Sequence, residues 1–220
     1  MLRSHLLLLL TLISLTASSQ VTSPWAESFF GPSSNEFISG VEIVDDEHVF
    51  IGGYSGDDIT LDTVTYTGSN FSFAAFFFDN DDSLAIEWSR KISSNGSVVL
   101  NNSAIDSDKS RIVCGMFSGS QCNLQDTTLS GNSGTNASNI FIAKWDSNGT
   151  FQWARGIPGF QLTSPSITTD QDGNIAMVFM FLDSVTIDST TYFNSNGTGQ
   201  SFFGNRNQVL VRLTPEGETS

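Results

Sequence analysis

The chain has few basic residues: nine Lys and Arg stand against 23 Asp and Glu, for a formal net charge of −14 over 220 residues. A surface this acidic repels the phosphates of nucleic acids and of anionic membranes. No stretch of clustered Lys or Arg with interleaved aromatics reverses that charge locally. We therefore expect no nucleic-acid partner.

Histidine is also scarce, and His48 is the single histidine beyond the apolar N-terminal segment. Nucleophilic catalysis needs an activated Ser or Cys beside a base, and a zinc site needs several His or Cys ligands. Neither arrangement is indicated by the sequence, and no glycine-rich phosphate loop of the G-x-x-x-x-G-K type is present. We predict that the protein is not an enzyme and needs no cofactor.

Long apolar runs are missing except at the N-terminus. Residues 1–19 combine a basic residue at Arg3, a largely apolar run over 6–15, and small residues at Ala17 and Ser19. This pattern is typical of a secretory signal peptide cleaved after Ser19. A membrane anchor is the less favoured interpretation, because the run is too short to cross the ~30 Å hydrocarbon layer. We expect a secreted or cell-surface protein with no membrane span after cleavage.

The chain has two cysteines, Cys114 and Cys122, in the short segment CGMFSGSQC. In an oxidising compartment two such thiols usually pair. If they lie on adjacent strands across a short loop, closing the ring would contribute about 2–3 kcal/mol on the chain-entropy account. We predict a Cys114–Cys122 disulfide, with two free thiols as the alternative.

The sequence repeats itself at intervals of about 64 residues. Trp25, Trp88 and Trp153 mark the repeat, and each is followed by Ala or Ser. Between them recur an Asp-rich turn, an apolar run, a Thr-bearing segment, a polar loop and a closing apolar run. The region 20–220 is thereby divided into three units, approximately 25–87, 88–152 and 153–220.

Each unit holds short runs of Val, Ile, Phe, Tyr and Thr bounded by Gly, Asn, Asp and Ser, as in strands joined by tight turns. No segment after the signal peptide keeps a helical apolar period with caps. Runs such as VFIGG (49–53) and RIVCG (111–115) are continuously apolar, as in strands covered on both faces. We predict an all-β fold of tandem four-stranded antiparallel blades of a β-propeller, with three blades visible.

Particular motifs carry a family resemblance. The relevant segments are DQDGNI (170–175), VCGMF (113–117), IGGY (51–54) and FIAKWDSNGTFQW (141–153). They resemble SBBP-type β-propeller repeats, which occur in exported bacterial and some eukaryotic surface proteins. The resemblance covers roughly residues 24–220 and implies a propeller fold with no shared catalytic residues.

The chain departs from this repeat pattern in two places. The first unit has DNDDSL (79–84) where the others have DSNGTF or TPEGET. The third unit has Phe179 where Gly53 and Gly115 stand in the others. Such drift is expected where the repeated positions serve packing and turns.

Three units are fewer than the four to eight blades that close a propeller. Gly149 lies shortly before Trp153, and the same interval counted from Gly217 would place a tryptophan just beyond Ser220. We therefore expect a longer form with further units. Three units alone would form an open stack with an exposed edge or close by oligomerisation.

Asp-rich turns raise the question of calcium, for which Asp170 and Asp172 in DQDGN are the best candidates. The segment resembles the start of an EF-hand loop but lacks the downstream bidentate Glu. Asp, Asn and Gly are also the residues that tight turns prefer. Turn formation is the favoured interpretation.

Six N-x-S/T sequons make the chain a candidate glycoprotein, provided that its secretory route glycosylates. They begin at Asn70, Asn95, Asn101, Asn136, Asn148 and Asn196.

Two functions from different classes remain open. The leading one is an exported, noncatalytic module for adhesion, scaffolding or recognition that binds extracellular protein or glycan through its loops. The alternative is a secreted polysaccharide hydrolase or lyase with acidic residues gathered at one propeller face. Carboxylates from different units that converge on one concave surface, with raised pKa values, would favour the second.

Overall fold

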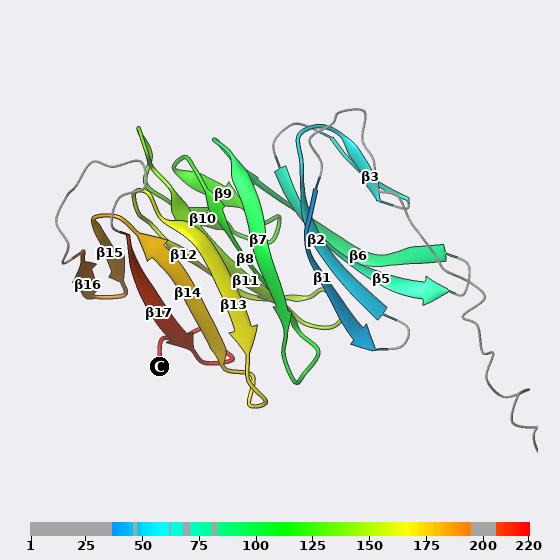
Figure 1. Ribbon diagram of the computed structural model, residues 1–220. Coiled ribbons are helices and arrows are strands. Elements are labelled where there is room, and N and C mark those ends of the chain that lie inside the picture. Colours follow the sequence, from blue (N-terminus) through cyan, green and yellow to red (C-terminus); the bar gives the residue numbers. More distant parts are fainter. Residues whose placement is uncertain (1–36, 46–47, 62, 68–70, 81–82, 195–205) are drawn as a thin grey trace, which may run out of the picture.

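The computed structural model describes residues 37–45, 48–61, 63–67, 71–80, 83–194 and 206–220. Every helix or strand within this part of the chain is a β-strand, so the all-β prediction is confirmed (Figure 1). The predicted signal peptide and Trp25 lie outside the described residues. Among the described residues, no helix is long and apolar enough to span a membrane.

The first sheet is an antiparallel meander in which a small hairpin is inserted. Its strands, in spatial order, are β1 (Phe37–Asp45), β2 (His48–Ser55), β5 (Phe71–Asn80) and β6 (Ser83–Ser94). The hairpin between β2 and β5 consists of β3 (Ile59–Leu61) and β4 (Val64–Tyr66).

The second sheet repeats this order. Its strands are β7 (Val98–Ile105), β8 (Arg111–Phe117), β11 (Asn139–Trp145) and β12 (Phe151–Ile157). The inserted hairpin is β9 (Gln121–Asn123) and β10 (Thr128–Ser130). β9 also pairs with the end of β6, so this hairpin extends the edge of the first sheet.

The third sheet has the same first three strands. They are β13 (Thr163–Thr169), β14 (Ile175–Phe181) and β17 (Asn207–Leu213), with the hairpin β15 (Ser184–Ile187) and β16 (Thr190–Phe193) inserted before β17. Trp88 and Trp153 lie in β6 and β12, the last strands of the first two sheets. The repeated tryptophan therefore closes a sheet, and the next sheet begins a few residues later.

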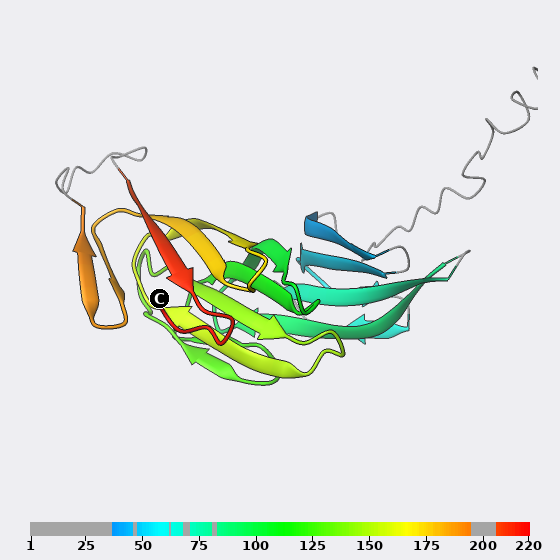
Figure 2. The same cartoon turned by 90° about the horizontal axis from the view of Figure 1, so that it is seen from below.

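The three sheets stack face to face, with the second in the middle (Figures 1 and 2). Alternate residues of the middle sheet enter different cores, because successive side chains of a strand point to opposite faces. Val113 and Phe141 pack with Phe50 and Trp88 of the first sheet. Their neighbours, such as Ile112, belong to the core shared with the third sheet. Burial on both faces explains the continuous apolar runs of β8 and β11.

The first strands of the three sheets lie side by side, with β7 between β1 and β13 (Figure 1). Side chains link these strands. The amide of Ile167 in β13 donates to Asn102 Oδ1 in β7 at 3.0 Å, and Thr169 Oγ1 donates to the carbonyl of Ile105 at 2.7 Å. On the other side, Ser103 Oγ of β7 donates to Glu42 Oε1 of β1 at 3.5 Å.

Strand register explains why Phe179 replaces a glycine. Gly115 in β8 lies opposite Phe141 in β11, whereas Phe179 in β14 lies opposite Val209 in β17. A Cβ on Gly115 would stand 2.5 Å from the Phe141 ring. Each sheet thus places one phenylalanine at this level. It lies on the third strand in the first and second sheets and on the second strand in the third sheet. The same register aligns Gly115 with Gly53, which lies opposite Phe73 in β5, as the sequence pattern predicts.

Candidate functional site at the sheet junctions

One five-residue turn recurs at the ends of the sheets. It occurs at 106–110, 146–150, 170–174 and 214–218. In each, the first amide donates to the fifth carbonyl and the fourth amide donates to the first carbonyl. The fourth residue has positive φ, and it is Gly in three turns and Lys109 in the other. Three of the four turns begin with Asp, so the Asp-rich segments at 106–110, 146–150 and 170–174 form one repeated kind of hairpin turn.

The calcium candidates Asp170 and Asp172 belong to one of these turns, and both are exposed. Asp170 Oδ1 accepts the amides of Asp172 and Asn174, at 3.0 and 2.9 Å. The Asn174 side chain donates to the same carboxylate, and this bond, followed by the backbone amides and the nearby Arg212 charge, lowers the pKa of Asp170. No group of three or more His, Cys, Asp or Glu side chains in the described part is placed to hold a metal. The carboxylate of Asp170 closes its own turn instead.

A tryptophan and an arginine from one sheet hold the turn of the next. The Trp88 indole lies against Gly149, where a Cβ would stand 2.6 Å from Trp88 Cγ, and its Nε1 donates to the carbonyl of Ser147 at 3.2 Å. Two residues later in β6, Arg90 Nη2 donates to the carbonyl of Gly149 at 2.5 Å. We call this arrangement the first clamp.

The second clamp repeats the first one sheet further on. A Cβ on Gly217 would stand 2.7 Å from the Trp153 ring, and Trp153 Nε1 donates to the carbonyl of Pro215 at 2.9 Å. Arg155 Nη1 donates to the carbonyl of Gly217 at 2.7 Å. Two independent copies of one geometry show that the clamp belongs to the repeat.

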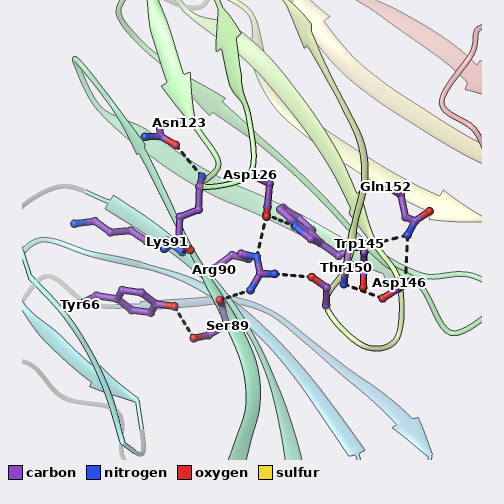
Figure 3. Close-up of polar contacts among 12 residues, drawn as sticks. Tyr66, Ser89, Arg90, Lys91, Asn123, Asp126, Trp145, Asp146, Thr150 and Gln152 are labelled. Carbon is purple, nitrogen blue, oxygen red and sulfur yellow. Dashed lines mark hydrogen bonds and ion pairs between the residues drawn. The ribbon is translucent and has the colours of Figure 1, made fainter.

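Each clamp arginine also pairs with an aspartate of the inserted hairpin. Arg90 Nε donates to Asp126 Oδ2 at 2.9 Å, and the Trp145 indole donates to the same oxygen at 2.9 Å (Figure 3). Arg155 pairs with Asp188, between β15 and β16, in the same way. The guanidinium therefore joins three segments: its own last strand, the next turn and the next hairpin.

A charged cluster lies where the first and second sheets meet. His48 Nδ1 is 2.5 Å from Asp45 Oδ1, and Lys109 Nζ is 2.7 Å from Asp45 Oδ2. Arg111, which is 1% exposed, lies nearby. Burial lowers the pKa of its guanidinium, and the carboxylates of Asp45, Asp106 and Glu87 oppose that effect. The cluster is a network of opposed charges, and His48 is bonded within it.

A groove of about 500 Å³ lies between β12 and the β15–β16 hairpin. Its polar lining comes from Asn132, Arg155, Thr186 and Asp188, and its apolar lining includes Ile157 and Ile187. Arg155 of the second clamp is part of this lining. Tyr192 and Phe193 on the same hairpin are 43% and 73% exposed.

The predicted disulfide is wrong: Cys114 and Cys122 are both free and buried. Cys114 in β8 belongs to the core shared with the third sheet, whereas Cys122 in β9 belongs to the core shared with the first sheet. The two thiols therefore face opposite sides of the middle sheet. Burial raises the pKa of Cys122 to about 12 and that of Cys114 further still.

The sequons fall in different settings. Asn95, Asn136 and Asn148 are exposed outside the strands. Asn101 lies within β7, and its Oδ1 is buried without a hydrogen-bond partner. Asn70 and Asn196 lie outside the described residues. Glycosylation stays a prediction, and Asn101 is the sequon that the fold least accommodates.

The residues predicted from the sequence did not include the clamp arginines. The signal for them was the recurrence of Trp88-Ser89-Arg90 as Trp153-Ala154-Arg155. The motif at Trp25 continues with Ala26 and Glu27, which concealed the pattern. Neither a family model nor a curated protein matches the chain.

Proposed function

We propose that the chain is an exported, noncatalytic β-propeller module that recognises an extracellular glycan or protein through its loops and hairpins. The observation that carries the proposal is the stacking of three equivalent meanders whose first strands lie together and whose clamps repeat. Propellers arrange their blades in this manner around an axis. The signal-peptide pattern supports export.

Five aspartates of the described residues support a noncatalytic role, and Glu42, whose pKa is raised by burial, accepts a hydrogen bond from Ser103 where β1 meets β7. Asp45, Asp106, Asp126, Asp170 and Asp188 are all held in ion pairs with Lys, Arg or His. A glycosidase needs two carboxylates that flank the scissile bond, one of them with a raised pKa. Carboxylates that serve turns and ion pairs fit a scaffold better than an acid–base pair.

The groove beside β15 is the recognition surface that we propose. Its amide and hydroxyl side chains, Asn132 and Thr186, offer hydrogen bonds of the kind that sugar hydroxyls or a peptide backbone accept and donate. The neighbouring exposed Phe193 offers an apolar face. A neutral or basic partner suits the strongly acidic chain.

Binding of residues 20–220 to an array of extracellular glycans, together with assays of sugar release from the glycans that bind, tests this proposal. We expect binding without release, and we expect Asn132→Ala and Thr186→Ala to weaken it at unchanged Tm. Thr60→Ala is the matched control, because Thr60 and Thr65 form in the β3–β4 hairpin the same hydroxyl pair that Thr186 and Thr191 form here. Sugar release would overturn the noncatalytic role, and variants that bind as tightly as the parent would overturn the groove.

A further inference from the structure

The first sheet has an apolar face that no described residue covers completely. Val41 and Ile43 of β1 are 57% and 79% exposed. In the β1–β2 pairing they lie opposite Ile51 and Val49, so all four share one face. Val49 and Ile51 belong to a core cluster separate from the one that faces the second sheet. The exposed face therefore points away from the rest of the stack.

The third sheet has a corresponding open face at the other end of the stack. Val178 in β14 and Leu210 in β17 lie opposite each other and are 36% and 72% exposed. Their neighbours Met177 and Val211 are buried against the second sheet. Val178 and Leu210 therefore point outward.

These two open faces continue the interfaces that join the sheets within the chain. Strand register aligns Val178 and Leu210 with Cys114 and Ile142, which are buried against the third sheet. It also aligns Arg212 with Lys144, whose Nζ donates to the carbonyl of Pro215 in the following sheet at 3.1 Å. The third sheet thus presents the positions with which the second sheet binds its successor.

The edge of β17 supports the same reading. β5 and β11 each pair with a fourth strand that carries the repeated tryptophan, whereas among the described strands β17 pairs with β14 alone. Within the described part of the chain, Thr219 forms a β-bridge with Leu213 and the amide of Ser220 donates to the carbonyl of Arg212.

We propose that the open face of the third sheet binds the open face of the first sheet in a second copy, head to tail. A head-to-tail contact either closes into a ring or grows into a filament. Two copies provide six sheets, which is within the four to eight that close a propeller, so the expected product is a closed dimer.

Light scattering coupled to size exclusion of residues 20–220 tests the assembly. We expect twice the mass of one chain, and we expect both Val178→Asp/Leu210→Asp and Val41→Asp/Ile43→Asp to give monomers with the circular dichroism of the parent. Phe193→Asp is the matched control, because it places the same charge at an exposed apolar residue outside both faces and leaves the dimer intact.

Mixing the two double variants distinguishes head-to-tail from symmetric contacts. One interface of the mixed dimer joins two unaltered faces, so we expect the dimer mass to reappear. A dimer of either double variant alone would show that a face is used against itself and would overturn the proposal, as would a monomeric parent or an unlimited series of larger species.

The inference rests on the proposed propeller arrangement but not on any ligand. Glycan binding by a chain that stays monomeric would overturn the assembly and leave the proposed function standing. A dimer that binds nothing on the array would support the assembly and count against the groove.

Discussion

The first three strands of the second and third sheets have the same order and the same turns. The second sheet is covered on both faces, whereas the third is covered on one. An equivalent ion pair shows the consequence. Lys144 Nζ lies 2.7 Å from Asp106 Oδ2, with side chains 8% and 1% exposed. Arg212 Nη2 lies 3.5 Å from Asp170 Oδ2, with side chains 62% and 46% exposed. The repeat sets the position of the pair, and the presence of a following sheet sets its environment.

Removing the cation should therefore have the largest effect in the covered sheet. Lys144→Met leaves the Asp106 carboxylate buried without its partner, and we expect it to lower the free energy of unfolding by about 3–5 kcal/mol. Arg212→Met should have a much smaller effect, because an exposed ion pair contributes little to stability. Urea denaturation of both variants measures the contrast. Equal losses would contradict it, and Lys144→Arg separates loss of charge from loss of shape.

Substitution of Gly115, which is closely packed against Phe141, should give the next largest loss of stability. A Cβ at this position would stand 2.2 Å from the carbonyl oxygen of Val99 and 2.5 Å from the Phe141 ring. We expect Gly115→Ala to cost about 1–3 kcal/mol, as overpacking does in close-packed cores. Gly156→Ala is the control for residue type, since Gly156 has no positive φ and a Cβ there would meet its nearest atom, the carbonyl oxygen of Ser130, at 3.3 Å. Equal losses of unfolding free energy for the two substitutions in chemical denaturation would contradict this prediction.

The two clamps are compared by substituting their glycines. Gly149 and Gly217 have φ values of 78° and 83°, and each lies against a tryptophan ring. We expect Gly149→Ala and Gly217→Ala each to cost about 1–2 kcal/mol from the left-handed conformation alone. The tryptophan contact adds to this. The Tm of each variant measures the loss of stability. If Gly149→Ala lowered Tm and Gly217→Ala did not, only the first clamp would contribute to stability, which would contradict the prediction.

A smaller, pH-dependent effect is expected where β1 meets β7. Burial raises the pKa of Glu42 from its ordinary value of 4.5, and the Ser103 hydroxyl partly opposes this. The ionised carboxylate is thus disfavoured in the folded chain, so the stability associated with neutral Glu42 is complete below the ordinary value and is lost as the pH rises through the raised one. Glu42→Gln should raise Tm slightly at pH 7 and leave it unchanged near pH 4. A gain of the same size at both pH values would contradict this account.

Treatment with a thiol reductant should not change the stability of the protein. Because Cys114 and Cys122 lie in different cores, dithiothreitol should leave Tm unchanged, and both thiols should resist alkylation until the chain unfolds. Mass spectrometry after alkylation in denaturant should detect two labels. A fall in Tm on reduction would show instead that the two cysteines form a disulfide.

The repeated residues made most of the fold predictable. The Asp-rich turns could be predicted because Asp, Asn and Gly favour tight turns through contacts with neighbouring residues. The Asp170 carboxylate does accept the backbone amide of Asn174 in its own turn. The alternation of strand and turn likewise depends on near neighbours in sequence. The disulfide was mispredicted because proximity in sequence says nothing about which face of a sheet each cysteine enters.

The sequence by itself determined the strands, the turns and the repeat, since period, turn residues and continuous apolar runs are local properties. Only the tertiary structure decided which face each residue buries, because that depends on register and on which sheet follows. It placed Arg90 on the turn around Gly149, 59 residues further along the chain. It also buried one ion pair and left its counterpart in solvent, because among the three described sheets the middle one alone has a neighbour on both sides.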